Sequence, residues 1–201
     1  MLLQRIVIAC GLMSRGSAFI ACFAFFGRKT DLGWTYQQNL ARAYAEETLQ
    51  VETRSYEGFG LINDDERMTQ VSQFVSGGCE IIFLCSGSFE YAANKVFAPA
   101  YPSVKFFILG GRRFMPLDNL GSAVIKVYQA SFIAGVVAAS SPNVSCLGYV
   151  GSTYMADSIL SINAFYKGAR SVNPNITMVL HHVGNWFMPR EERIAALRLF
   201  R

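Results

Sequence analysis

The chain has 201 residues, of which 52% are hydrophobic and 16% charged, and it carries a formal net charge of +4. A chain of this length buries a core of its own, and the low charged fraction argues against an intrinsically disordered or coiled-coil protein. The basic residues are scattered without forming a run or a stripe, so no nucleic-acid partner is expected. Composition therefore predicts a globular α/β protein with buried, largely parallel strands.

The N-terminal segment, residues 1–16, is interpreted as an extension or as a remnant signal segment. Residues 7–10, Val-Ile-Ala-Cys, have the form of the small-residue site at which bacterial lipoproteins are cleaved and acylated, which makes Cys10 a candidate for lipidation. A signal peptide needs an apolar core of about 7–15 residues, whereas Arg5 leaves only residues 6–9 before the cysteine. A start further upstream and a chance match both stay open. Charged residues interrupt this apolar region before it reaches the length of a transmembrane helix.

From residue 17 to residue 120, short apolar runs alternate with stretches of helical periodicity. This alternation predicts a doubly wound parallel sheet, which we interpret as an N-terminal lobe. The predicted strands span residues 18–26, 51–56, 80–85 and 104–109. Helices are predicted at residues 37–49 and 91–98, where Pro99 is expected to end the second of them. Between them, another helix is expected to begin after a cap at Asn63 or Asp64 and to end at Gly77-Gly78.

Residues 121–201 are predicted to form a second, partial C-terminal lobe with the same alternation. Residues 112–121 are interpreted as an irregular segment in which the chain passes from one lobe to the other. An apolar helix is expected from about residue 123 to 140. Strands are then predicted at residues 144–150 and 177–181, and helices at residues 155–170 and 191–200. The fold class is therefore α/β, with two doubly wound parallel-sheet lobes of which the second is incomplete.

The reactive side chains give no catalytic pattern. The five cysteines lack metal-site or redox spacing, and we expect them to be buried free thiols apart from Cys10. His181 and His182 adjoin each other on a predicted strand, which would point them to opposite faces. A phosphate-binding glycine loop, a nucleophile elbow and paired metal ligands are all absent from the sequence. We therefore expect neither an enzyme nor a cofactor or metal site.

Ligand-binding candidates are sought just after each strand, because the ligand crevice of an open parallel sheet lies at the carboxyl ends of its strands. Trp34 follows the first predicted strand and Trp186 follows the last, and both flat indoles suit stacking on a heterocycle. Each could instead cover the end of its own sheet. Asp31 could accept ligand N–H groups or cap the next helix, and the hydroxyls of Ser88 and Tyr91 could bind a ligand or satisfy local backbone.

Several motifs in order resemble the basic membrane protein family. These motifs are residues 31–36 (Asp-Leu-Gly-Trp-Thr-Tyr), 128–135 (Tyr-Gln-Ala-Ser-Phe-Ile-Ala-Gly), 162–165 (Ile-Asn-Ala-Phe) and 168–174 (Gly-Ala-Arg-Ser-Val-Asn-Pro). The resemblance implies a type I periplasmic-binding-protein fold and an extracytoplasmic receptor that feeds purines or purine nucleosides to the membrane subunits of an ABC importer. It also implies that Trp34 and Trp186 sandwich the purine ring, and Asn163 in the third motif joins the candidate ligand-binding residues.

The resemblance also sets the expected ligand, mechanism and location. Nucleoside-binding relatives carry an aspartate where this chain has Leu109-Gly110, which favours a free purine base over a nucleoside without deciding between them. The expected mechanism is closure of two lobes around the ligand. The expected location is the periplasm or the cell surface, with Cys10 as a lipid anchor. The alternatives are a ligand-sensing regulatory domain and a truncated remnant of the same fold that binds nothing.

Overall fold

The computed structural model describes residues 19–111 and 116–200. Cys10, the candidate lipidation site, lies outside the described residues. The chain divides into two compact units between Val124 and Ile125, four residues beyond the lobe boundary expected from the sequence. Among the described residues, the helices are too short or too polar to cross a membrane.

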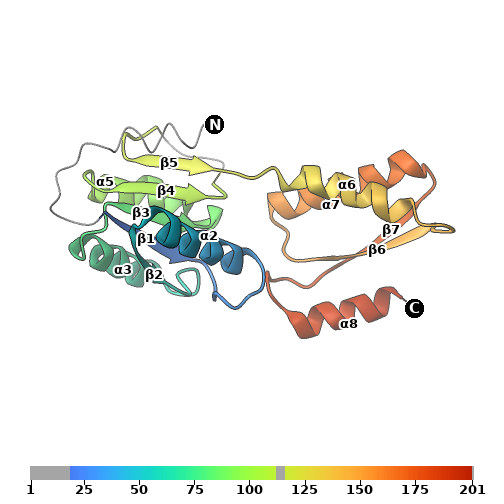
Figure 1. Cartoon of the computed structure of the whole chain (residues 1–201). Coiled ribbons are helices and arrows are strands. Elements are labelled where there is room, and N and C mark those ends of the chain that lie inside the picture. Colours follow the sequence, from blue (N-terminus) through green and yellow to red (C-terminus); the bar gives the residue numbers. More distant parts are fainter. Residues whose placement is uncertain (1–18, 112–115, 201) are drawn as a thin grey trace. The chain divides into compact units, whose positions relative to one another are not determined.

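Unit 1 is built on a five-stranded, fully parallel sheet with the strand order β2-β1-β3-β4-β5 (Figure 1). Its strands are β1 (Ile20–Phe25), β2 (Glu52–Tyr56), β3 (Ile81–Cys85), β4 (Lys105–Leu109) and β5 (Leu120–Ala123). Its long helices are α2 (Trp34–Leu49) and α3 (Asp64–Ser76), and shorter turns η1 (Gly87–Phe89), α4 (Glu90–Ala92), η2 (Ala93–Phe97) and α5 (Ala98–Ala100) follow β3.

The core of unit 1 follows from the two-residue period of its strands. In β1, Cys22 and Ala24 face a large cluster that includes Phe74 of α3 and Phe97 of η2. The intervening Phe23 faces the opposite side of the sheet, where its ring stacks on Phe83 with 4.8 Å between the centroids. Helix α3 begins where Asn63 accepts the Glu66 backbone N–H and Glu66 accepts the Asn63 N–H, which is a reciprocal capping box.

Two sequence predictions in unit 1 are wrong. The helix after β3 does not stop before Pro99, because α5 continues through Pro99 to Ala100. The preceding turn η2 is π-helical, and its wider spacing relieves the contact between a proline ring and the carbonyl one α-helical turn earlier. In addition, part of the segment taken as irregular forms β5, which pairs with β4. The buried Asn119 side chain fixes the start of β5 by donating to the carbonyls of Ala98, Tyr101 and Val104.

Unit 2 contains a two-stranded parallel sheet of β6 (Cys146–Gly151) and β7 (Thr177–His182). Helices α6 (Val127–Ala139) and α7 (Ala156–Val172) lie on one side of this sheet, and α8 (Pro189–Leu199) lies on the other side. Helices α6 and α7 approach closely at Gly135 and Gly168, where a Cβ atom would collide with the backbone of the partner helix. The apolar helix begins at Val127 and not near residue 123, because β5 occupies residues 120–123.

The prediction of free cysteines is wrong for one pair, because Cys22 and Cys79 form a disulfide. Cys22 lies in the central strand β1, and Cys79 lies in the turn between α3 and β3, with 5.9 Å between their Cα atoms. Both are buried in the core of unit 1. The two remaining described cysteines are free, Cys85 as a buried thiol and Cys146 as an exposed one. The two cysteines are 57 positions apart, so their contact could not be predicted from the sequence.

We predict that reduction of this disulfide destabilises unit 1. A cross-link between residues 57 positions apart removes conformational entropy from the unfolded chain, worth about 4 kcal/mol on the loop-closure model. Urea unfolding with and without a thiol reductant should show a large loss of stability for the wild type and none for the Cys22→Ala/Cys79→Ala double variant. Cys146→Ala is the control, because it removes an exposed thiol and should keep the full response to reductant.

Candidate functional site

The indole of Trp34 lies across the carboxyl ends of β3 and β4. Trp34 is the first residue of α2, and its Nε1–H donates to the carbonyl oxygen of Cys85, the last residue of β3, at 2.8 Å. The six-membered part of the same ring, at Cζ2 and Cη2, approaches Gly110, which directly follows β4. The indole is therefore fixed by the hydrogen bond at Nε1 and by packing of the adjacent ring atoms, while 39% of the residue stays exposed to solvent.

Two glycines make room for this arrangement. Gly110 has a φ of 87°, a left-handed conformation that glycine adopts without strain, and a Cβ there would lie 3.4 Å from the Trp34 ring. At Gly87 a Cβ would collide with the carbonyl of Gly110. The backbones of the turns after β3 and β4 therefore contact each other, and the Trp34 ring packs against the second of these turns at Gly110. The sequence analysis missed this contact, because it joins two separate loops.

Asp31 caps the helix that carries Trp34. Its Oδ1 accepts the backbone N–H groups of Gly33 and Tyr36, both at 2.9 Å, and its Oδ2 accepts the N–H of Thr35 at 3.0 Å. Burial alone would raise the pKa of Asp31, but the hydrogen bonds from Tyr36, Gly33 and Thr35 outweigh burial and hold the pKa below its ordinary value. Two roles were considered for Asp31, and these hydrogen bonds correspond to helix capping.

We predict that the contribution of Asp31 to stability is lost in acid. A carboxylate with a lowered folded-state pKa stabilises the protein above the unfolded value of about 4, and this stabilisation disappears as the pH falls through the folded-state pKa. Asp31→Asn should therefore be less stable than wild type at neutral pH, and the gap should narrow below about pH 4. Chemical unfolding followed by circular dichroism across this range measures the gap. Asp65→Asn, on the exposed start of α3, is the charge-matched control, and a gap for Asp31→Asn that stays constant into acid would contradict the assignment.

The hydroxyl candidates after β3 lie in the short turns that follow the strand. Ser88 is exposed, and its backbone N–H donates to the Ser86 hydroxyl at 3.2 Å, so Ser86 caps this turn. Tyr91 is 76% exposed. Both residues therefore lie near the same strand end as the Trp34 indole, with side chains accessible from solvent.

In unit 2, Trp186 lies in the loop between β7 and α8 and is 48% exposed. Its backbone N–H donates to the Asn185 side chain at 2.7 Å, and the neighbouring Phe187 is also half exposed. Trp34 and Trp186 thus each lie in the segment that follows a parallel strand of their own unit, Trp34 after the first strand of unit 1 and Trp186 after the second strand of unit 2. Asn163 lies elsewhere, exposed in the middle of α7 and about 10 Å along the helix from its start.

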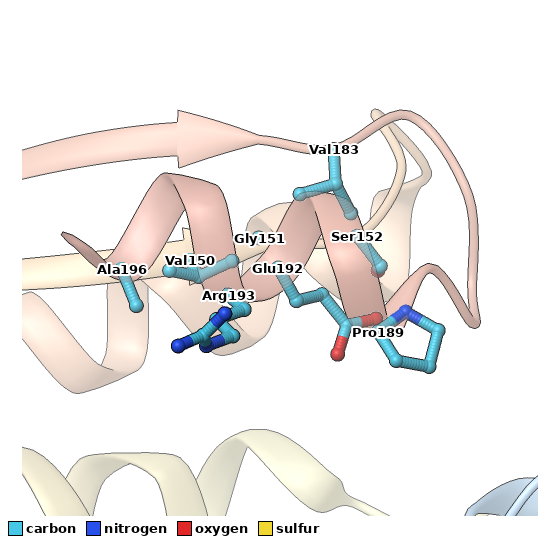
Figure 2. A pocket seen from close by; sticks show the side chains of 8 residues that line it. All are labelled: Val150, Gly151, Ser152, Val183, Pro189, Glu192, Arg193 and Ala196. Carbon is cyan, nitrogen blue, oxygen red and sulfur yellow. The ribbon is translucent and has the colours of Figure 1, made fainter. Parts of the chain in front are cut away.

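A pocket of about 480 Å³ opens in unit 2 between β6 and α8 (Figure 2). Its walls are mainly apolar, with Val150 and Gly151 from β6, Val183 after β7 and Ala196 from α8. Glu192 also lines it, and its Oε1 accepts the backbone N–H of Met188 at the start of α8. Within the described ranges, no three metal-ligating side chains gather in a way that could hold an ion.

Comparison with known proteins shows what the chain is similar to. The family model of the ABC transporter substrate-binding proteins described as PnrA-like (Bmp) matches residues 20–201. A purine-binding protein of Brucella abortus is 33% identical over 179 residues, which cover 88% of this chain and 50% of that protein. A putative ABC transporter glucose-binding protein of Haloferax volcanii is 28% identical over 183 residues, which cover 91% of this chain and 46% of that protein.

A solved ABC transporter solute-binding protein from Aeropyrum pernix superposes with a TM-score of 0.78 at 17% sequence identity. The match covers 90% of this chain and 52% of that structure. It confirms the α/β fold with parallel sheets that the sequence predicted. The chain spans about half the length of these proteins.

Proposed function

Because the chain belongs to the PnrA-like family of ABC transporter substrate-binding proteins, we propose that it carries the purine-stacking part of an extracytoplasmic receptor for a purine base or nucleoside. The family consists of receptors that bind a solute and not of enzymes. The observation that carries the proposal is the Trp34 indole, which is fixed at the carboxyl edge of sheet β2-β1-β3-β4-β5 by the Cys85 carbonyl. The Brucella abortus relative is itself a purine-binding protein, which supports the same ligand class.

The geometry of Trp34 suits a stacking platform. Its only polar atom is committed to the Cys85 carbonyl, so the ligand meets an apolar aromatic face and not a donor. A ring held by a hydrogen bond and by packing loses little conformational entropy when a ligand arrives, which raises the affinity gained from each contact. Stacking of a base on an aromatic side chain contributes about 1–3 kcal/mol.

Trp186 is proposed as the second stacking face, because it lies just after β7, a parallel strand of unit 2, and is half exposed. In this proposal, the hydroxyls of Ser88 and Tyr91 bind polar edges of the ligand, and Asn163 is the least supported contact because it lies along α7 and away from the strand ends. Gly110 at the end of β4 offers no side chain to a ribose, which favours the free base over the nucleoside.

The setting proposed for the receptor is the periplasm or the cell surface. The buried Cys22–Cys79 disulfide supports it, because such bonds form and persist in oxidising compartments. Cys10 is the proposed lipid anchor. The membrane subunits of an ABC importer are the proposed partners, since they are what a substrate-binding protein of this family serves.

Titration with adenine, guanine and hypoxanthine tests the proposal. We expect each purine that binds to quench tryptophan fluorescence and to raise the melting temperature. Trp34→Ala and Trp186→Ala should each weaken the affinity by about 5- to 150-fold, the equivalent of one lost stacking contact. Trp34→Phe should retain more affinity than Trp34→Ala, because a flat aromatic ring remains although the hydrogen bond to the Cys85 carbonyl is lost.

Leu40→Ala is the matched control, since it alters the same helix at an exposed position outside the proposed site. A folded wild-type chain that shows neither quenching nor thermal stabilisation would contradict the proposal and favour a remnant without a ligand. Tight binding that is unchanged in Trp34→Ala would refute the stacking role.

A further inference from the structure

The carboxylate of Glu90 lies close to the indole of Trp34 at the carboxyl end of β4. A Cβ atom placed on Gly110 would lie 3.4 Å from the Trp34 ring. A Cβ atom placed on the next residue, Gly111, would lie 3.4 Å from Oε1 of Glu90. The Cα atoms of consecutive residues are about 3.8 Å apart. The ring and the carboxylate therefore flank the same short turn, and a ligand stacked on the indole comes near a strong hydrogen-bond acceptor.

The backbone that carries Glu90 is fixed by its neighbours. Glu90 is the first residue of α4, and its N–H donates to the carbonyl of Gly87. The preceding Phe89 is 1% exposed and packs edge to face on Phe59, with 4.9 Å between the ring centroids. The Asn94 side chain donates to the Glu90 carbonyl at 2.7 Å. The side chain of Glu90, a partly buried residue, therefore extends from an anchored turn.

The end of β4 leaves room for this carboxylate. Gly110 has a φ of 87°, Gly111 is buried, and neither carries a side chain. A Cβ atom on Gly111 would approach Ile108 to 2.7 Å, so a larger residue would not fit there without movement. The side chain beside the end of β4 is therefore supplied by the turn after β3, through Glu90.

Two other carboxylates near this edge of the sheet hold loops together. Asp31 accepts three backbone N–H groups at the start of α2. Glu57 accepts the backbone N–H of Lys29 at 2.9 Å and pairs with its ammonium group at 3.4 Å. Glu90 also has a partner within the protein. A carboxylate offers two oxygens with about four acceptor sites, so Glu90 can keep that partner and accept from a ligand as well.

We propose, on the basis of the proposed purine-binding function, that Glu90 is a specificity-determining residue that accepts two adjacent hydrogen-bond donors from a ligand stacked on Trp34. A carboxylate only accepts, and its two oxygens suit a pair of parallel donors, as in its bidentate pairing with arginine. Two parts of a purine ligand present such a pair, the N1–H and 2-amino groups of guanine and the 2′- and 3′-hydroxyls of ribose. Glu90 therefore selects ligands that carry a donor pair over ligands that lack one.

Titrations of the 201-residue chain, followed by tryptophan fluorescence, test this selection. Guanine has the 2-amino group that hypoxanthine lacks, and inosine has the 2′-hydroxyl that 2′-deoxyinosine lacks. In at least one of these comparisons, the wild type should prefer the ligand with the complete donor pair by about 10- to 150-fold, the range of one hydrogen bond to a charged group. Glu90→Gln should remove this preference, because the amide turns one acceptor into a donor.

The two comparisons separate the two sources of the donors. A preference for guanine over hypoxanthine that Glu90→Gln removes assigns the carboxylate to the base. A preference for inosine over 2′-deoxyinosine that Glu90→Gln removes assigns it to the ribose. Glu80→Gln is the matched control, because it changes an exposed glutamate just before β3, at the opposite end of the strand, and should keep both ratios.

Ratios of affinities separate this proposal from the stacking proposal. Trp34→Ala should weaken guanine and hypoxanthine by similar factors, because stacking does not depend on the donors. If Glu90→Gln leaves both ratios unchanged, or if the wild type shows neither preference, Glu90 does not select the ligand, whereas the stacking role of Trp34 stands. If the wild type binds no purine, the proposed function fails and the role of Glu90 fails with it.

Discussion

The parallel direction of the strands is the constraint on which the candidate site depends. When β1, β3 and β4 all run the same way, the chain leaves each of them at one edge of the sheet, and residues far apart in sequence meet there. Trp34 reaches the Cys85 carbonyl, 51 positions away, only because of this arrangement. The Asp31 carboxylate then fixes the first turn of α2, so a helix cap sets the position of the indole.

This arrangement separates two kinds of residue that the sequence could not distinguish. Asp31 and Ser86 satisfy local backbone N–H groups, and their polar atoms stabilise the turns in which they lie. Trp34 donates its only side-chain hydrogen bond to the Cys85 carbonyl and stays 39% exposed. In the proposed site, Trp34 therefore contributes stacking, and hydrogen bonds to the ligand come from neighbouring loops.

Most of the fold could be predicted because the strands are continuous apolar runs and the helices carry a clear periodicity. Strand β5 was missed because Leu-Gly-Ser-Ala has little strand propensity, and it forms through pairing with β4 and through the three hydrogen bonds of Asn119. The Cys22–Cys79 disulfide and the contact between Gly87 and Gly110 were missed for a related reason. Each depends on the distance between separate loops, which a linear sequence does not contain. Trp34 and Trp186 could be chosen in advance, because their positions after strands are visible in the sequence.

The two units differ in how much of their stability they supply themselves. Unit 1 has a five-stranded sheet, two core clusters and a disulfide, whereas the described sheet of unit 2 has two strands and one core cluster, so it depends more on the helices that pack against it. Trp186 follows β7, and β7 pairs with β6 among the described residues, so the position of the loop that carries Trp186 depends on this two-stranded sheet.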